Sequence, residues 1–296
     1  MDSPPKPPST SSRGVLFALL AFGSWGIVPL FWRLLAGVPA TELLAHRVAW
    51  SLVVVTILLS ALGGGREAFA ALRSPRRAGL FLLSSALIAA NWGIFIWAIA
   101  AGRLSEASLG YFINPLANVV LGVVALGERL GRLQWLAVGL AAAAVGLLVF
   151  TADGVPWVAL SLAGTFAVYG LIRKLAPLAS LPGLFLETLL LAPFALGAIV
   201  WFEQRGGLLG RGDLSLLLLA AASGVVTSLP LVWFTAAARR LPLSTMGLFQ
   251  YVAPWLQLLI AILIFGEQVA AIRWLAFVLI WSALAIHSVS LARRRA

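Results

Sequence analysis

The feature that most constrains this chain is a succession of apolar runs, each about as long as a membrane is thick. A helix needs roughly 20 apolar residues to cross the hydrocarbon core of a bilayer. Ten runs qualify, at residues 14–36, 42–62, 79–101, 104–126, 133–151, 156–175, 183–202, 214–238, 243–265 and 270–290. The runs are continuous rather than alternating, which favours helices over a barrel. We therefore predict an all-α integral membrane protein with ten transmembrane helices and the lipid bilayer as its surroundings.

The positive charges lie in the short gaps between these runs. If the N-terminus is cytoplasmic, fifteen of the 21 Lys and Arg residues lie on the cytoplasmic side, five lie on the other side, and Arg47 lies within a run. Cytoplasmic loops carry such an excess, so we expect both termini to be cytoplasmic. The net charge of +11 is spread over many gaps rather than gathered in one patch, so we expect no nucleic-acid partner.

Several kinds of site lack their usual residues. The chain has no Cys, and its two His residues, His46 and His287, are far apart, so we expect no metal site and no cofactor. The longest gap, residues 63–78, is a short basic loop, and no soluble domain fits between the runs. Any function must therefore reside within the helix bundle.

The two halves of the sequence resemble each other. The segment GERLGRLQWLA at 127–137 matches GEQVAAIRWLA at 266–276, and Pro115 pairs with Pro254 at the same offset of 139. Each half holds five runs, so the second half must enter the membrane from the opposite side. We predict a disordered cytoplasmic tail (1–13), two inverted repeats (14–151 and 152–290) and a basic cytoplasmic tail (291–296). Inverted repeats are typical of secondary transporters.

One polar helix face is the first candidate for contact with a solute. Tyr111, Asn114 and Asn118 are spaced by three and four residues and so share a face. An amide without a partner is costly in hydrocarbon, so this face should point into the bundle or a cavity. The residues could contact a solute, or the amides could form hydrogen bonds between helices.

Other aromatic and amide side chains extend this candidate set. They are Trp25, Asn91, Tyr169, Gln250 and Tyr251. Together they could line a cavity for an amphipathic solute, through stacking and sparse hydrogen bonds. The alternative is that they serve as packing residues or as anchors at the membrane surface.

Charged residues near the start of the second run form another candidate group. Glu42 and His46 are one helical turn apart and can form a hydrogen bond, and Arg47 follows directly. His46 titrates near neutral pH and could relay protons. The alternative is an interfacial ion pair, with the Arg47 side chain reaching outward to the membrane surface.

Two further acids could couple transport to an ion. Glu106 lies in the first turns of its run, where it could cap a helix, attract a cationic solute or carry a proton. Glu187 lies about one turn into its run, and Lys174 could be its partner. The functional and structural interpretations of Glu187 both stay open.

Three segments carry a resemblance to a known family. They are SWGIVP at 24–29, ELLAHRVAWS at 42–51 and EASLGYFINPL at 106–116. The chain resembles the RarD-type permeases of the EamA family, in the drug/metabolite transporter superfamily, over residues 14–290. The resemblance implies a bacterial inner-membrane permease. It also implies a central cavity between the helices at 14–36, 79–101, 104–126, 156–175, 214–238 and 243–265.

These observations favour a secondary transporter that moves a small organic solute by alternating access, with proton coupling as an option. The chain has no nucleotide-binding loop, which argues against direct coupling to ATP. A membrane channel or sensor is the alternative. An intramembrane lipid-modifying enzyme is less favoured, because the runs contain no Asp and the chain has no Cys for a catalytic centre, so we expect no enzyme activity.

Overall fold

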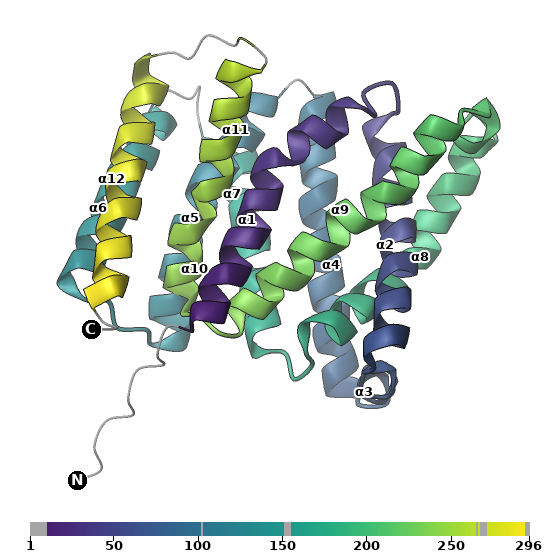
Figure 1. Ribbon diagram of the computed structural model, residues 1–296, viewed down its shortest axis with the longest axis horizontal. Helices are drawn as coiled ribbons and strands as arrows, with labels where there is room; N and C mark the ends of the chain where they lie inside the picture. Colours follow the sequence, from purple (N-terminus) through teal and green to yellow (C-terminus); the bar gives the residue numbers. More distant parts are fainter. Residues whose placement is uncertain (1–10, 102, 151–154, 265, 267–270, 294–296) are drawn as a thin grey trace.

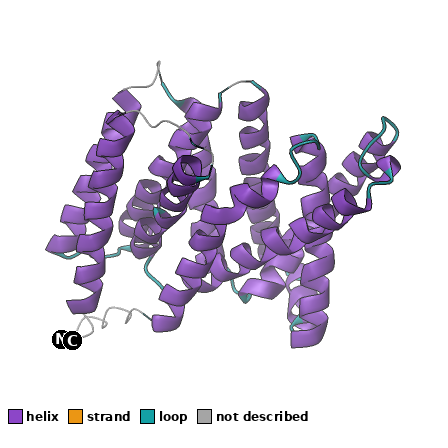
Figure 2. Cartoon of the chain, turned by 45° about the horizontal axis from the view of Figure 1, so that its top comes forward, coloured by secondary structure: helices purple, strands orange, loops and turns teal. Residues whose placement is uncertain are grey.

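The apolar runs fold as helices. The computed structural model describes residues 11–101, 103–150, 155–264, 266 and 271–293, and within these ranges the chain has helices and no strand (Figure 2). Nine helices of the described chain are long and apolar enough to cross a membrane. The predicted class, an all-α multi-pass membrane protein, is therefore confirmed at this level. The last helix has a shorter apolar stretch among its described residues, Trp274–Ser290.

The helix bounds follow the predicted runs to within a few residues. The helices are α1 (Ser12–Arg33), α2 (Ala40–Leu62), α3 (Gly65–Leu72), α4 (Pro75–Ala100), α5 (Leu104–Leu126), α6 (Arg132–Phe150), α7 (Trp157–Leu175), α8 (Ser180–Glu203), the 3-10 turn η1 (Leu209–Arg211), α9 (Leu214–Ala238), α10 (Leu243–Gln250), α11 (Val252–Leu263) and α12 (Ala271–Arg293). Of the predicted terminal tails, residues 1–10 and 294–296 lie outside the described part of the chain.

The composition of the gap at 63–78 had indicated an irregular loop, and the structure differs from this prediction. The gap contains the short helix α3, which begins after Gly63 and Gly64, both at positive φ (83° and 104°). α3 buries Ala68 and Ala71, while its Phe69 ring packs edge-on against Phe185 at 5.7 Å. The loop was mispredicted because eight residues are too few for a clear periodic signal.

The ninth run is divided into α10 and α11. The division falls at Tyr251, three residues before Pro254. Proline has no backbone N–H and its ring crowds the carbonyl four residues earlier, here that of Gln250, so an α-helix is interrupted at this point. The break brings Gln250 and Tyr251 to a position where both contact α5.

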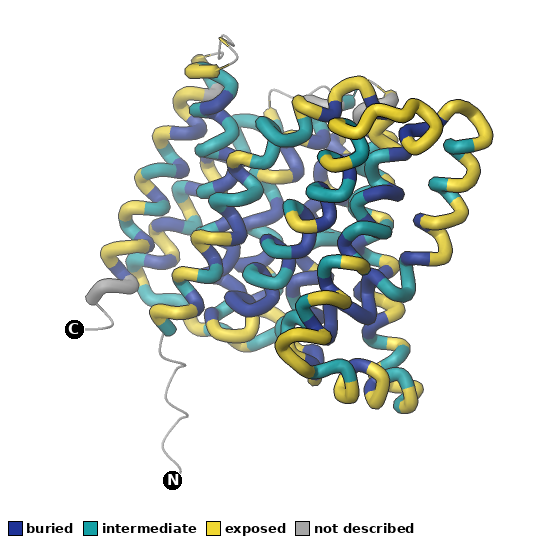
Figure 3. The backbone as a smooth tube through the Cα atoms, turned by 45° about the vertical axis from the view of Figure 1, so that its right-hand side comes forward, coloured by how far each residue is buried: buried dark blue, intermediate teal, exposed yellow. Residues whose placement is uncertain are grey.

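The helices form a bundle with a peripheral pair at one edge. α6 and α12 pack mainly on each other at that edge, α2 and α8 lie toward the other edge, and α1, α5, α7, α9 and α10 lie between (Figure 1). Buried residues concentrate in the middle of the bundle (Figure 3). α1 begins and α12 ends on the same side of the molecule, which we call the terminal side. We call the side where α1 ends and α12 begins the opposite side.

Candidate functional site

An ion pair lies buried in the bundle toward the terminal side. Arg173, in the last turn of α7, and Glu187, in the second turn of α8, are 0% and 1% exposed. Arg173 Nε lies 3.5 Å from Glu187 Oε1. A buried charge is costly unless it is paired and its remaining polar atoms are satisfied. The stability of this buried pair therefore depends on the polar groups around it.

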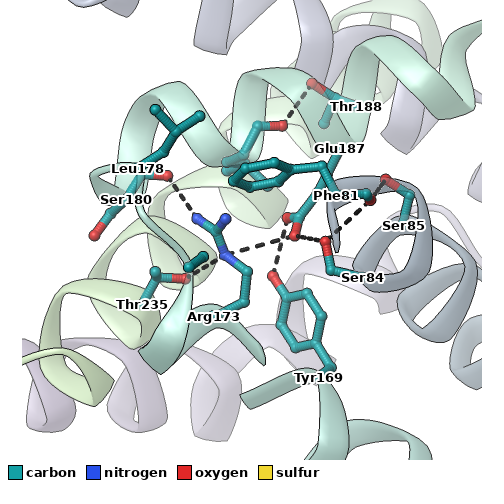
Figure 4. A network of polar contacts seen from close by, with 12 residues as sticks. Phe81, Ser84, Ser85, Tyr169, Arg173, Leu178, Ser180, Glu187, Thr188 and Thr235 are labelled. Atoms are coloured by element: carbon teal, nitrogen blue, oxygen red, sulfur yellow. Dashed lines mark hydrogen bonds and ion pairs between the residues drawn. The ribbon is translucent and has the colours of Figure 1, made fainter. Parts of the chain in front are cut away.

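Further polar groups from four helices surround the pair (Figure 4). Ser84 of α4 donates to Glu187 Oε1 at 2.6 Å, and Tyr169 of α7 donates to Glu187 Oε2 at 3.2 Å. Arg173 Nη2 donates to the Ser180 carbonyl at 3.0 Å, and its Nε lies 3.5 Å from Thr235 Oγ1 of α9. We call these six residues the Arg173–Glu187 network. It ties α4, α7, α8 and α9 together.

The network corrects the predicted partner of Glu187, which is Arg173 and not Lys174. Lys174 Nζ instead donates to the carbonyls of Ala238 and Leu241, where α9 ends. Sequence reasoning missed Arg173, although its spacing of four residues from Tyr169 places the two on one helix face. That spacing was the available signal.

A small void lies next to the network, with room for about one water molecule. Its lining residues come from α2, α4, α7, α8 and α9: Val48, Ser51, Ile88, Trp92, Tyr169, Leu184, Glu187, Thr188, Leu191, Thr227 and Leu231. Lining by α4, α7 and α9 agrees with the cavity that the family resemblance implies. Lining by α2 and α8 was not expected, and no lining residue comes from α1, α5 or α10.

Arg47 lies beside the same void and points into the bundle. Its guanidinium carbon is 4.8 Å from the ring centre of Trp32 and 5.1 Å from that of Trp92. Its Nε donates to Thr227 Oγ1 at 3.1 Å. Trp92 and Thr227 both line the void. These contacts with α1, α4 and α9 differ from the outward-reaching, interfacial alternative considered for Arg47.

The amides predicted to contact a solute form hydrogen bonds between helices. Asn91 donates to the Leu162 carbonyl and to Thr165 Oγ1 of α7, and Asn114 donates to the Ala163 carbonyl. Asn118 donates to Asn114 Oδ1 at 3.1 Å and to Gln250 Oε1 at 2.8 Å, which joins α5 to α10. These contacts match the interhelical alternative, and contact with a solute stays a prediction.

The aromatic candidates fall into separate groups. Trp25 and Tyr169 belong to one cluster, in which Trp25 lies 5.7 Å from Phe234 and Tyr169 stacks on Phe234 at 6.3 Å. Tyr251 is fully buried and donates to the Phe112 carbonyl at 3.1 Å. Tyr111 is 43% exposed, packs edge-on against Phe95 at 6.1 Å and lies near Arg47. Of the predicted set, Tyr169 lines the void and Tyr111 lies near Arg47.

One described group has the donor types of a metal site. Ligand atoms of Glu42, His46 and Glu203 lie within 4.8 Å of one another. The carboxylates already accept backbone N–H bonds, Glu42 from Leu208 and Glu203 from Leu209 and Gly210. The group therefore anchors the loop between α8 and α9, and Glu42 pairs with that loop rather than with a cation.

Glu106 caps a helix, although not its own. It accepts from Val158 N at 2.8 Å, at the start of α7, and pairs with Arg103 at 2.7 Å. A carboxylate at the N-terminus of a helix stabilises the unpaired N–H groups there. The capping alternative therefore describes its contacts in this structure.

Comparisons with known proteins give a consistent assignment. The EamA-like transporter family matches residues 12–150. An uncharacterized transporter of Vibrio cholerae serotype O1 is 45% identical over 282 residues, covering 94% of this chain and 93% of that protein. The RarD proteins of Streptomyces exfoliatus and Escherichia coli (strain K12) are 47% and 44% identical, and the alignments cover 92% and 93% of this chain and 87% and 93% of those proteins.

A solved crystal structure shares the fold. It superposes with a TM-score of 0.73 over 96% of this chain and 99% of the other, at 18% sequence identity. Its likeness and the close relatives agree with the helical bundle and with the apolar spans described above. The chain therefore belongs to the EamA-like transporter family, as a RarD-type membrane transporter.

Proposed function

We propose that this protein is a secondary transporter of the bacterial inner membrane, which moves a small organic solute by alternating access between two inverted repeats. The repeats are residues 14–151 and 152–290, and α12 is the tenth crossing. The Arg173–Glu187 network closes the solute route on the terminal side. The route continues through the void toward Arg47 and the opposite side.

The pattern of helix contacts is the observation that carries this proposal. If the repeats are equivalent, α1 corresponds to α7, α4 to α9, and α5 to α10 with α11. Exchanging the two halves of the chain then relates the contact between α1 and α9 to the contact between α7 and α4. It likewise relates the contact between α1 and α11 to the contact between α7 and α5. All four contacts are present. Three further contacting pairs each join equivalent helices of the two halves, so the exchange leaves them unchanged: α2–α8, α5–α10 and α6–α12. Such exchange supports a pseudo-two-fold axis within the bundle.

Individual residues agree with the same offset. Phe112 and Tyr251 are 139 residues apart, and the Tyr251 hydroxyl donates to the Phe112 carbonyl. Two equivalent positions can contact each other only close to the axis that relates them. Gly127 and Gly266 share that offset and have nearly the same left-handed φ, 63° and 65°. These pairs support inverted repeats with an axis near α5 and α10.

The location of the polar groups supports alternating access. The void is far smaller than an organic solute, and two members of the Arg173–Glu187 network, Tyr169 and Glu187, line it. A buried network has few intermediate arrangements, because a partly broken one leaves polar groups unpaired. It therefore suits a gate with a closed and an open state. Glu187 is also the acid whose protonation would weaken the network, which provides a route for proton coupling.

Transport by purified protein tests the proposal. The protein is reconstituted in liposomes with a mixture of metabolites outside, with and without an imposed pH gradient, and the internal contents are measured by mass spectrometry. We expect at least one organic solute to accumulate above the level in protein-free liposomes, with saturation at high concentration. No accumulation of any solute under either condition would contradict the proposal, and non-saturating flux with single-channel currents would favour a channel.

A further inference from the structure

Arg47 is a charged residue in the bundle without an acidic partner in the described part of the chain. The ion pairs there are Arg103–Glu106 and Arg173–Glu187. Glu42 and Glu203 are occupied by the loop between α8 and α9, as described above. A cation within a membrane bundle is costly and normally marks a path for solutes or ions. Arg47 therefore contributes positive charge that a negatively charged solute could balance.

The surroundings leave one side of the guanidinium available. Trp32 and Trp92 lie against the group at 4.8 Å and 5.1 Å, and Thr227 accepts from Nε. The two terminal nitrogens have no hydrogen bond to a described residue, and the side chain is half-buried rather than enclosed. Guanidinium binds a carboxylate through two parallel N–H bonds, and flanking rings hold its plane in place.

The position of Arg47 connects this charge to the solute route. Trp92 and Thr227 contact Arg47 and also line the void, whose other lining residues include Tyr169, Leu184 and Leu231. Tyr111, 43% exposed, lies near Arg47. A bound solute would thus meet a cation and a phenol at one end and, at the other, the mainly apolar lining of the void, where the acid Glu187 is already paired with Arg173. This is the polarity of an amphipathic organic anion.

We propose that Arg47, held between Trp32 and Trp92, binds the carboxylate of an organic anion whose apolar part extends toward the void. The inference rests on the proposed transport function and narrows its substrate class. The carboxylate completes the hydrogen bonds of the two terminal nitrogens and neutralises the charge. The indole rings exclude water from this contact, which strengthens it.

A matched series of ligands and variants tests this assignment. Phenylacetate, phenylacetamide and phenethylamine share a benzene ring and differ in the charge of the head group. Binding to the purified full chain is measured by isothermal titration calorimetry and by the shift in melting temperature. The variants are Arg47→Gln, Arg47→Lys and Arg205→Gln. Arg205 stacks on Trp201 at 4.0 Å but is exposed, so it controls for loss of a stacked arginine elsewhere.

We expect phenylacetate to bind and to raise the melting temperature, and the amide and the amine to bind at least tenfold more weakly. Arg47→Gln should weaken phenylacetate binding by roughly tenfold to hundredfold, as loss of charged hydrogen bonds does. Arg47→Lys should weaken it less, and Arg205→Gln should leave it unchanged. If Arg47→Gln does not fold, the relative affinities of the unaltered protein for the three ligands test the assignment.

Two outcomes would overturn the assignment. One is a lack of preference for phenylacetate over its amide and amine, including no binding of any of the three. The other is equal phenylacetate binding by Arg47→Gln and the unaltered protein. Either result leaves the transport proposal standing if liposomes accumulate a neutral or cationic solute. Absence of all transport, with phenylacetate binding intact, would instead refute the transport proposal alone.

Discussion

Gly183 is the residue on which the position of Arg173 depends most directly. A Cβ at position 183 would lie 2.5 Å from Arg173 Nη2 and 2.7 Å from Cζ, closer than atoms can approach. Gly183→Ala must therefore displace a guanidinium that is buried and paired. We expect a loss of about 1–3 kcal/mol in unfolding free energy, as for other overpacked sites. Thermal and detergent-induced unfolding of the purified protein would measure it.

Gly197→Ala in the same helix provides the control for that substitution. No atom lies within 4 Å of a Cβ built at Gly197, and alanine is the better helix former. Gly197→Ala should therefore leave stability unchanged or raise it slightly. Equal stability of the two variants would mean that Arg173 is not held in the position described.

The Arg173–Glu187 pair gives a second prediction for single residues. Removing one partner of a buried pair leaves the other charge uncompensated and typically costs about 3–5 kcal/mol. Arg173→Met and Glu187→Met should each destabilise by that amount. The double variant should be more stable than the sum of the two losses implies, because no unpaired charge remains. Unfolding in mixed micelles measures the coupling, and additive losses would contradict a direct ion pair.

These residues also mark the limit of prediction from sequence. Glu187 could be identified as an acid within an apolar run, but Arg173 and Lys174 are adjacent and equally charged. Their side chains point about 100° apart on the helix, so the choice of partner depends on how α7 is rotated against α8. Rotation is set mainly by packing with α5 and α4, and the spacing of Tyr169 and Arg173 alone does not fix it.

At the level of helices, the sequence predicted most of what the structure contains. The apolar runs place the long helices because each run matches the thickness of a membrane. The sequence was less informative where a helix is short or interrupted. α3 was missed, and Pro254 alone could not predict the break at Tyr251, because α5 continues through the equivalent Pro115. Glu106 could be identified as a helix cap, but not the helix that it caps, α7, because capping partners can come from distant segments.

Glu128 illustrates this last point and leads to a prediction. The carboxylate of Glu128 lies just before α6 in the sequence, but it accepts from Leu243 N, Ser244 N and Ser244 Oγ at the start of α10. It therefore joins the two halves of the chain. Glu128→Ala should cost about 2 kcal/mol, since three hydrogen bonds to a charged group are lost. Glu67→Ala, an exposed acid of α3, is the control in the same unfolding assay.

A matching loss for Glu128→Ala and Glu67→Ala would show that the cap contributes nothing beyond a surface charge. A specific loss for Glu128→Ala would be accompanied by faster hydrogen exchange in the first turn of α10. That turn has no other side-chain cap in the described part of the chain.

For the whole molecule, the direction of each half in the membrane decides whether the two repeats are inverted. With α12 as the tenth crossing, α1 begins and α12 ends on the terminal side, and from the excess of Lys and Arg we predict that this side is cytoplasmic. The connection between α3 and α4, which contains Ser74, lies on the terminal side, and the end of α8, which Gln204 follows, lies on the opposite side. Seven crossings separate Gln204 from the start of the chain.

The absence of Cys from the chain permits a clean test of this topology. Single cysteines are introduced by Ser74→Cys and Gln204→Cys, and a third is appended after Ala296. Intact cells are treated with a membrane-impermeant maleimide, and the unaltered protein is the control for background. We expect Gln204→Cys to be labelled in intact cells, and the other two only after lysis. Labelling of the appended cysteine in intact cells would mean that α12 does not cross, and an odd number of crossings cannot form two five-helix repeats.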